Sequence, residues 1–309
     1  MDQAFDIITL LGPTASGKTS LAVALAAERD AEIISADSRQ VYCRMDIGTG
    51  KDLDDYRIDG RTIPYHLIDI CEPGTQYNLF AYQRDFHRAY EDIRSRGKCA
   101  LLCGGTGLYI ESVLKGFHLP DVPANPALRR QLQDKSLDEL TEMLRCFKTL
   151  HNTTEVDTVN RAVRAIEIEV YLQDHPQETS RYAPLKSLTI GLMLDRDVRR
   201  ARITERLHAR LQAGMVDEVQ ALLDSGIPAE NLLYYGLEYR FVTRYLLGEL
   251  SYGEMAAQLE TAIHQFAKRQ MTWFRGMEKR GLPIRWIDAL APRSEQLAQI
   301  RAWAETGNA

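Results

Sequence analysis

The sequence has little of what builds disulfide-stapled or zinc-binding proteins. Its 309 residues include only five cysteines, an odd number, and no C-x-x-C pair occurs among them. The seven histidines show no H-x₃-H spacing. We therefore expect neither a disulfide framework nor a protein-built zinc site, and unpaired thiols suit a reducing cytoplasm.

Long apolar runs and an excess of positive charge are also missing. No uninterrupted apolar run approaches the roughly 18 residues needed to span a bilayer, and residues 1–6 lack the basic start of a signal peptide. We expect a cytoplasmic protein without membrane contact. The net charge of −5 does not indicate a nucleic-acid binder, but binding depends on where charge lies.

The most informative segment is GPTASGKT at residues 12–19, which fits the pattern G-x-x-x-x-G-K-[ST] without a mismatch. An apolar run at 7–11 precedes it and a helical pattern at 20–28 follows, which is the strand–loop–helix context that this motif requires. Its glycines allow successive N–H groups to form an anion nest at a helix N-terminus. Lys18 adds a positive charge, and the Thr19 hydroxyl can ligate Mg²⁺. The segment predicts binding of a di- or triphosphate compound.

Asp37 is the first acidic residue expected beside this loop. It follows a predicted strand at 32–35, and ligands of open parallel sheets lie beyond the carboxyl ends of the strands. The carboxylate could hold Mg²⁺ in a small-molecule kinase, or accept a proton from a nucleophile that attacks a carbon bearing diphosphate. It could also be only a turn or N-cap residue. P-loop enzymes that act on ATP or GTP usually carry a second acid at the end of an apolar strand to hold Mg²⁺. Here the apolar strand at 99–103 ends in Gly-Gly-Thr-Gly without such an acid, and Asp69 is a poor substitute for it.

The remaining pattern predicts an α/β protein with a P-loop NTPase-like parallel sheet flanked by helices and an all-helical insertion. Helices are expected at 80–94 and 108–114, and composition changes at Gly116, after which three prolines follow within seven residues. We expect a core of residues 1–116 plus 187–309, with C-terminal helices, and a helical insertion at 117–186. A capping box at Ser136 and a helix at about 156–172 lie in that insertion.

The C-terminal third reads as helical after a strand at 188–194. One amphipathic helix is expected to run through Leu223 and end at Ser225-Gly226. A second capping box, at Ser251, opens a helix to about residue 275, and a short strand is expected at 283–287. Residues 44–78 are rich in Gly, Asp and Pro and predict mostly loop, with a short strand at 66–69.

Basic residues gather in two helical places. Residues 196–210 contain six arginines, and residues 264–285 contain six basic residues against one acid, with Phe266, Trp273 and Phe274 among them. A solvated helix face is the usual explanation of either run. For the second run, with its aromatic residues, a surface for RNA backbone and unstacked bases explains the pattern equally well.

In order along the chain, these motifs resemble those of the tRNA dimethylallyltransferases (tRNA isopentenyltransferases). Besides residues 12–19, the match includes SADSRQVY at 35–42, DIGTGK at 46–51, HLID at 66–69, GGTGLY at 104–109 and KRQMTWFR at 268–275. The phosphate loop alone is unspecific, but the ordered set covers nearly the whole chain and is highly specific.

The resemblance implies that a dimethylallyl group passes from dimethylallyl diphosphate to N6 of the adenine 3′ of the anticodon, in tRNAs reading codons that start with U. It implies a flipped acceptor base, Mg²⁺ as cofactor and the tRNA anticodon stem-loop as partner. We expect a monomer, although the sequence does not determine the oligomeric state. Asp37 matches the general base, with Lys18 and Thr19 also catalytic and Thr19 contacting Mg²⁺. The implied diphosphate-binding residues are Gly12, Pro13, Thr14, Ala15, Ser16, Gly17, Lys18, Thr19 and Arg206. The implied tRNA-binding residues are Asp37, Ser38, Arg39, Gln40, Thr106, Arg129, Asn160, Arg161, Ala162, Val163 and Arg164.

Two segments depart from the family pattern. The family usually has Gly-Thr-Ala-Lys-Pro where this chain has GTGKD at 48–52, and Ile-Gly-Tyr-Lys-Glu where it has YGLEY at 235–239. No tRNA contact is therefore carried over to the second segment. The family has paired arginines at the positions of Arg202 and Arg206, and Arg206 is the one expected at the diphosphate. A P-loop kinase for a small metabolite and a non-catalytic, ATP-dependent RNA-binding protein are the alternatives, and ATP could also fit the loop.

Overall fold

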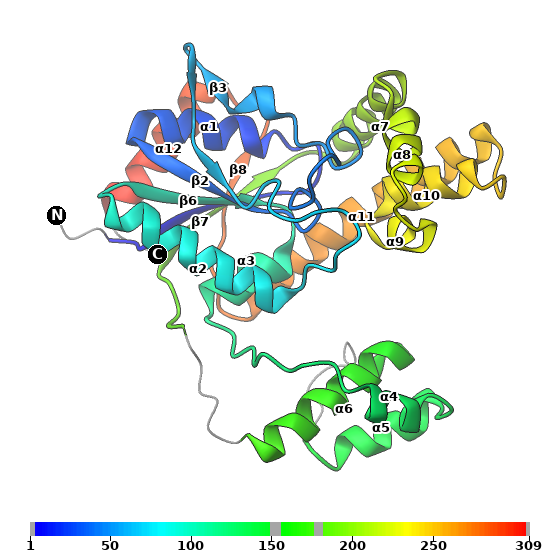
Figure 1. The fold of residues 1–309 in the computed structure, drawn as a ribbon. Helices are drawn as coiled ribbons and strands as arrows, with labels where there is room; N and C mark the ends of the chain where they lie inside the picture. The colour runs from blue at the N-terminus through cyan, green and yellow to red at the C-terminus, as the bar shows by residue number, and fades with distance from the viewer. Residues whose placement is uncertain (1–3, 149–155, 176–181, 307–309) are drawn as a thin grey trace. The chain divides into compact units, whose positions relative to one another are not determined.

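The computed structural model describes residues 4–148, 156–175 and 182–306 (Figure 1). It divides into two compact units, one of Met1–Lys115 with Pro184–Ala309 and one of Gly116–Ala183. The loop expected at 176–186 lies partly outside the described residues. Within the described ranges, no helix combines the length and the apolar character that crossing a membrane requires.

The larger unit is built on six parallel strands in the order β5-β2-β6-β1-β7-β8. The strands are β1 (Ile7–Leu11), β2 (Ala31–Ala36), β5 (Tyr65–His66), β6 (Cys99–Gly104), β7 (Ser187–Met193) and β8 (Arg285–Asp288). Every residue of β1 and β2 is buried, as expected of a parallel sheet covered on both faces. The parallel sheet predicted from the sequence is confirmed.

Alternate residues of the central strands divide between two hydrophobic cores. Ile7, Leu11 and Leu102 pack with α2 (Leu79–Ser95), α3 (Gly107–Leu114) and α11 (Tyr252–Lys279). Ile8 and Leu10 pack instead with α1 (Lys18–Arg29) and α12 (Arg293–Thr306). Because side chains alternate along a strand, one sheet holds helices on both faces (Figure 1).

The helices after β7 differ from the prediction at one point. The prediction of a single helix through Leu223 was wrong, because two helices occupy this segment. The first, α7 (Arg196–Gln212), is capped by Ala213, and the second, α8 (Met215–Asp224), begins after Gly214. Gly214 has a φ of 97°, a conformation that glycine adopts without strain. Two short helices follow, α9 (Ala229–Tyr234) and α10 (Leu237–Leu246).

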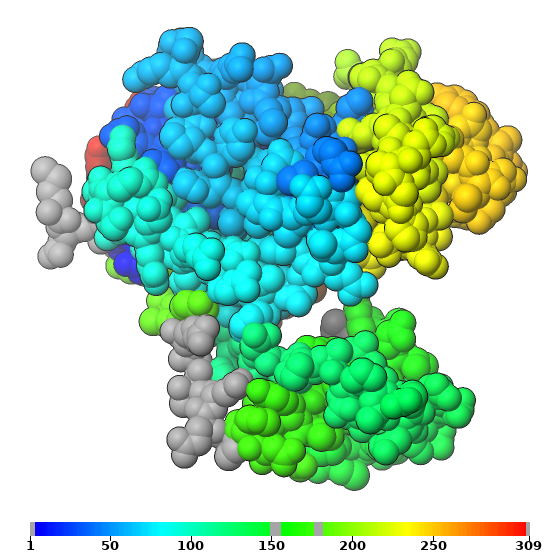
Figure 2. Space-filling model, viewed as in Figure 1, coloured from blue at the N-terminus to red at the C-terminus, as the bar shows by residue number. Residues whose placement is uncertain are grey.

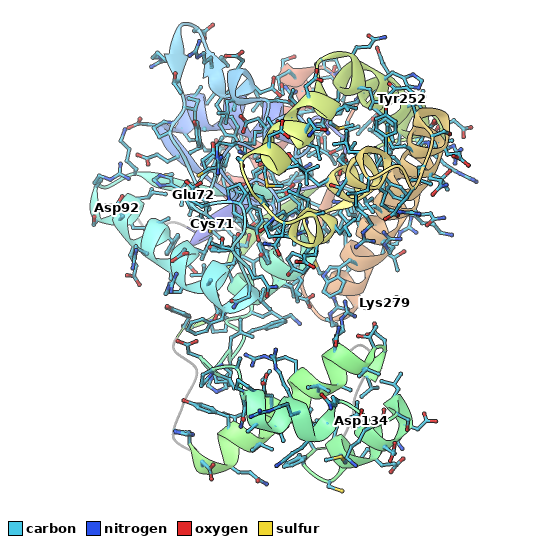
Figure 3. The ribbon with its side chains drawn as sticks, turned by 45° about the vertical axis from the view of Figure 1, so that its right-hand side comes forward. Cys71, Glu72, Asp92, Asp134, Tyr252 and Lys279 are labelled. Atoms are coloured by element: carbon cyan, nitrogen blue, oxygen red, sulfur yellow. The ribbon has the colours of Figure 1, made fainter. Side chains whose placement is uncertain are left out.

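The helix predicted to begin at Ser251 is the longest element of the structure. The Ser251 capping box is present, and α11 runs for 28 residues to Lys279, one turn beyond the predicted end. Figure 3 labels Tyr252 and Lys279 at its two ends. Its buried residues recur at helical spacing and include Met255, Leu259 and Ile263.

Residues 44–78 contain more regular structure than the expected loop. A 3₁₀ turn, η1 (Leu53–Tyr56), leads into an antiparallel pair, β3 (Arg57–Ile58) and β4 (Arg61–Thr62). The strand expected at 66–69 ends at His66, because Leu67 and Asp69 have φ values of 63° and 55° that leave the extended region.

The smaller unit is helical and has its own core. It contains α4 (Pro126–Leu132), α5 (Leu137–Arg145) and α6 (Val159–Asp174), and the capping box predicted at Ser136 is present. Leu132, Leu140, Leu144, Ala162 and Ile166 form its buried cluster.

Candidate active site

The phosphate loop lies between β1 and α1 and leaves the first turn of α1 open to an anion. Gly17 caps that helix in the left-handed region, with a φ of 80° and without a side-chain cap hydrogen bond. A Cβ on Gly12 would lie 2.7 Å from the Ser16 Oγ, so any larger residue there would displace that hydroxyl. The Ser16 Oγ is itself buried, and it has no hydrogen-bond partner within the described chain. A ligand oxygen would satisfy it.

Lys18 lies in a strongly charged environment. Desolvation is the largest effect and lowers the pKa of Lys18, while nearby Cys103 and Asp37 raise it. Arg206 and Arg210 are close enough to lower the pKa further. The structure thus brings Asp37 and two arginines of α7 close to the phosphate loop. Asp37 and these arginines are about 170 residues apart in the chain.

Asp37 directly follows β2, as predicted, and it closes a turn. Its Oδ1 accepts a hydrogen bond from the Arg39 N–H at 2.9 Å. The next residue, Ser38, donates its N–H to the Thr106 Oγ1 at 3.1 Å, which joins the ends of β2 and β6. Asp37 therefore takes part in a turn through Oδ1, and this contact does not involve its other carboxylate oxygen.

The other residues expected after β2 have structural contacts. The Gln40 side chain donates to the Gly50 carbonyl at 3.0 Å and accepts from the Ser35 hydroxyl at 3.2 Å. The Arg39 guanidinium lies 5.6 Å from the ring centroid of Tyr234, an exposed aromatic residue of α9. This pair is a cation–π contact at the surface of the larger unit.

Gln270 of α11 is a site residue that the sequence patterns did not single out. Its Oε1 accepts from the Thr14 N–H at 3.0 Å, and its Nε2 donates to the Gly105 carbonyl at 2.9 Å. The buried amide thereby joins the phosphate loop to the turn after β6. The sequence signal for it is its place inside the family motif at 268–275, a cluster expected to contact the tRNA backbone and to pack through Trp273.

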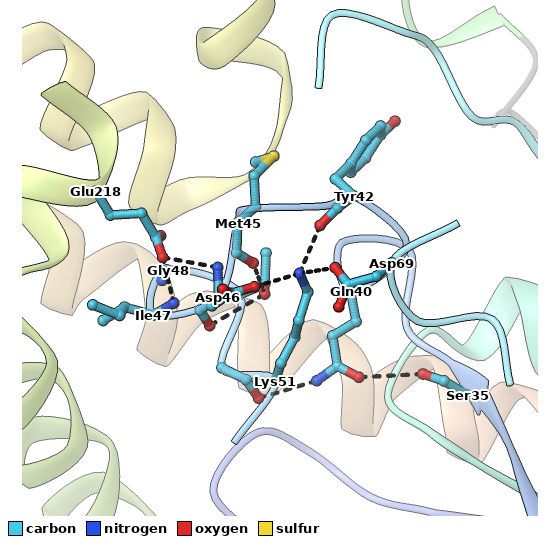
Figure 4. A network of polar contacts seen from close by, with 12 residues as sticks. Ser35, Gln40, Tyr42, Met45, Asp46, Ile47, Gly48, Lys51, Asp69 and Glu218 are labelled. Atoms are coloured by element: carbon cyan, nitrogen blue, oxygen red, sulfur yellow. Dashed lines mark hydrogen bonds and ion pairs between the residues drawn. The ribbon is translucent and has the colours of Figure 1, made fainter. Parts of the chain in front are cut away.

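Residues 46–52, which include the GTGKD segment, are held in place by ion pairs and by hydrogen bonds to charged side chains (Figure 4). The Glu218 carboxylate of α8 accepts the N–H groups of residues 46, 47 and 48 at 2.8, 2.7 and 3.0 Å. The buried Lys51 ammonium donates to Asp46 at 2.6 Å, to Asp69 and to the Tyr42 carbonyl at 2.7 Å. Asp69 is thus engaged as an ion-pair partner of Lys51. In Figure 2 this segment (blue) lies against the yellow helices α8 to α10.

A pocket opens beside the phosphate loop. Thr14 and Ala15 line it together with Arg206, Arg210 and Glu238, while Arg202 is not among the lining residues. The Arg206 Nη2 lies 2.8 Å from the Asp52 Oδ2. Desolvation raises the pKa of Glu238, and the two arginines act against that rise. The sequence patterns missed Arg210 and Glu238, because nothing local to either residue indicates the pocket.

Two of the residues expected at tRNA in the smaller unit, Arg129 and Arg164, pair with one buried acid, Glu167. Arg129 Nε and Nη2 donate to Glu167 at 2.8 and 2.9 Å, and Arg164 Nη1 donates to it at 2.6 Å. Ala162 is buried in the helical core, and Val163 packs against that core. Asn160 and Arg161 are exposed, with Arg161 paired to Asp157.

In the second basic run, residues 264–285, some side chains are buried in packing contacts and others lie exposed at the surface. Phe274 is fully buried, and Arg280 pairs with the buried Glu111 while lying 5.5 Å from the Trp273 ring centroid. A Cβ on Gly107 would lie 2.2 Å from the Trp273 ring, so α3 and α11 meet closely. Phe266 is exposed beneath the Arg269 guanidinium, and these two residues are free to face a ligand.

The site suits a cation that keeps most of its water. No cluster of three or more His, Cys, Asp or Glu side chains that could hold a metal exists in the described part of the chain. Mg²⁺ usually takes only one or two protein oxygens together with substrate phosphates and water. The Thr19 hydroxyl and the Asp37 carboxylate are oxygen donors of that kind, so their chemistry fits Mg²⁺.

A parallel sheet with a phosphate-loop sequence between β1 and α1 places the protein in the P-loop NTPase-like fold class. Residues 40–277 match the family model described as IPP transferase, and residues 5–62 match isopentenyl transferase. The chain belongs to the tRNA dimethylallyltransferase family of prenyltransferase enzymes, as the sequence motifs predicted.

Relatives and solved structures agree with this assignment. The chain is 65% identical over 294 residues to tRNA dimethylallyltransferase 2 of Porphyromonas gingivalis, covering 95% of this chain and 97% of that protein. It is 29% identical to the full-length tRNA isopentenylpyrophosphate transferase of Bacillus halodurans, with a TM-score of 0.70, covering 97% and 96% of the two chains. A eukaryotic dimethylallyltransferase acting on tRNA, 22% identical with a TM-score of 0.75, shares the fold; the match covers 96% of this chain and 77% of that one. The P-loop NTPase-like fold class is thereby confirmed.

Proposed function

We propose that this enzyme transfers a dimethylallyl group from dimethylallyl diphosphate to N6 of the adenine 3′ of the anticodon, in tRNAs that read codons starting with U. The products are N6-isopentenyladenosine in tRNA and free diphosphate. The observation that carries the proposal is the meeting of Asp37 with Lys18 and the arginine-lined pocket, within a chain of this family.

The chemistry requires one carbon–nitrogen bond to form and one carbon–oxygen bond to break. N6 of adenine attacks C1 of the prenyl group, and the electron pair of the C1–O bond leaves with the diphosphate. Asp37 accepts the proton that N6 loses, which needs a carboxylate near the nucleophile. Its Oδ1 already accepts the Arg39 N–H, and this bond fixes the orientation of the carboxylate.

Departure of diphosphate requires positive charge where negative charge develops. The first-turn N–H groups of α1, Lys18 and Arg206 would supply it on one side of the donor. Thr19 would hold Mg²⁺, which when bound offsets charge on the diphosphate oxygens. The acceptor adenine must leave its stack to reach Asp37, because an enzyme cannot reach a base atom inside a helix. Thr106, hydrogen-bonded to Ser38 next to Asp37, would contact the tRNA there.

Incubation with labelled dimethylallyl diphosphate, Mg²⁺ and total tRNA tests the proposal. We expect label on adenine next to the anticodon and release of one diphosphate per prenyl group. ATP hydrolysis without incorporation of label would contradict it and favour a P-loop kinase. Omitting tRNA is the matched control, since a small-molecule kinase would not need it.

A further inference from the structure

Two guanidinium groups converge on the GTGKD segment at the edge of the phosphate-loop pocket. The Asp52 Oδ2 lies 2.8 Å from the Arg206 Nη2 and 3.7 Å from the Arg210 Nη2. A Cβ on Gly50 would lie 2.5 Å from the first of these nitrogens and 1.5 Å from the second. Gly50 therefore provides the space that Arg210 occupies, and its φ of 65° also favours glycine.

Arg210 has a donor that the protein does not use. Its side chain is 14% exposed, and its Nη2 is buried without a hydrogen-bond partner in the described structure. Desolvation and then the neighbouring Arg206 lower its pKa, while Glu238 and Asp52 act against that fall. A buried donor of this kind calls for an acceptor, and an anion would serve best.

The position of Arg210 indicates which anion would accept its hydrogen bond. Arg210 lines the same pocket as Thr14 and Ala15 of the phosphate loop, so an acceptor of its hydrogen bond lies within the phosphate-binding site. Glu238 lines the pocket as well and is desolvated beside the arginines. Gly50, Asp52 and Glu238 are also three positions at which the chain departs from the usual family motifs.

We propose that Arg210 is a second diphosphate-binding arginine, which Asp52 orients and for which Gly50 makes room. The inference rests on the proposed function for the identity of the donor, dimethylallyl diphosphate. In this arrangement Arg206 and Arg210 donate to the diphosphate opposite the phosphate loop, and a diphosphate oxygen accepts the hydrogen bond that the Arg210 Nη2 does not make within the described chain. Glu238 limits the excess positive charge of the pair.

The test measures affinity for inorganic diphosphate with Mg²⁺ by calorimetry on the full-length protein, alone and with an anticodon stem-loop RNA bound. Arg210→Met keeps the helix and most of the volume but removes the charge. We expect its diphosphate affinity to fall roughly ten- to hundredfold, the range for losing a charged hydrogen bond, and its RNA affinity to stay within about threefold. Arg200→Met, an exposed arginine of the same helix, is the matched control and should bind diphosphate as the wild type does.

Unchanged diphosphate affinity in Arg210→Met would overturn the inference. So would a loss of RNA affinity alone, which would make Arg210 a tRNA contact. If that variant does not fold, Arg210→Lys and Gly50→Ala decide the matter, since both should weaken diphosphate binding and wild-type affinity in both would refute the role. Prenyl transfer by the wild type is scored separately. A wild type that binds diphosphate but transfers no prenyl group would refute the proposed function and leave the arginine test valid.

Discussion

The side-chain amide of Gln270 accepts the backbone N–H of Thr14 at 3.0 Å across 256 residues of sequence. The same amide donates to the Gly105 carbonyl, so a single buried group ties the phosphate loop, the turn after β6 and the long helix α11 together. Since α11 also carries the exposed Phe266 and Arg269, this contact connects the donor site to a helix with a basic, aromatic surface.

Replacing Gln270 should loosen the phosphate loop. In Gln270→Ala the Thr14 N–H and the Gly105 carbonyl lose their partner, and we expect stability to fall by about 1–3 kcal/mol, with the KM for dimethylallyl diphosphate several-fold higher. Urea unfolding and steady-state kinetics measure the two effects. Gln265→Ala, exposed on the same helix, should change neither, and equal effects in both variants would argue against the bridge.

Substitution of Asp37 should reduce prenyl transfer without weakening tRNA binding. We expect Asp37→Asn to reduce prenyl transfer by about 10²- to 10⁴-fold, because proton acceptance is lost, while the affinity for tRNA stays near that of the wild type. Single-turnover transfer and filter binding test this. The exposed Asp59→Asn is the control. A binding protein without catalytic use of Asp37 would show no difference between the two variants.

Arg161 should contribute to tRNA binding through charge alone. It is exposed on α6, so Arg161→Ala should weaken tRNA binding, reduce the salt dependence by about one phosphate contact, and leave the affinity for diphosphate unchanged. Titrations at several salt concentrations measure the slope. Arg145→Ala on α5 is a matched exposed arginine. A parallel loss of diphosphate affinity would contradict a role limited to RNA.

Arg164 should behave differently from Arg161, because it also donates to the Val122 carbonyl at 2.8 Å and to the buried Glu167. We expect Arg164→Ala to weaken tRNA binding and also to destabilise the helical unit by roughly 1–3 kcal/mol. Thermal unfolding of both variants distinguishes them. Equal stability of the two would show that the Glu167 contacts of Arg164 matter little.

Glu167 should make stability depend on acid pH. Burial by itself raises its pKa, but the hydrogen bonds from Arg129, Asn125 and Arg164 outweigh burial and hold the pKa at about 2, below the ordinary 4.5. A depressed carboxyl pKa adds stability above pH 4.5, and this contribution disappears as the pH falls toward 2. The contribution of Glu167 to the free energy of unfolding amounts to roughly 3 kcal/mol. Denaturant unfolding of the full chain from pH 6 to 2 should therefore show a shallower loss in Glu167→Gln than in the wild type, with Glu142→Gln as control.

The local features of this protein were readable from its sequence because they depend on neighbouring residues. The phosphate loop needs its glycines at fixed spacing, the capping boxes at Ser136 and Ser251 need an acid three residues later, and the buried strands need apolar runs. The position of Asp37 followed from one topological rule, that parallel strands present their carboxyl ends at one edge.

Tertiary structure alone decided which distant residues meet there. Gln270, Arg210 and Glu238 reach the loop only because α7 and α10 pack on α11, whose buried residues share a core with β1 and β6. No local periodicity encodes such pairings. The break at Gly214 was likewise not readable, since a glycine within a helical pattern is tolerated or terminates the helix according to what the next helix packs against. Sequence determined the chemistry available to each segment, and packing determined which side chains share the pocket.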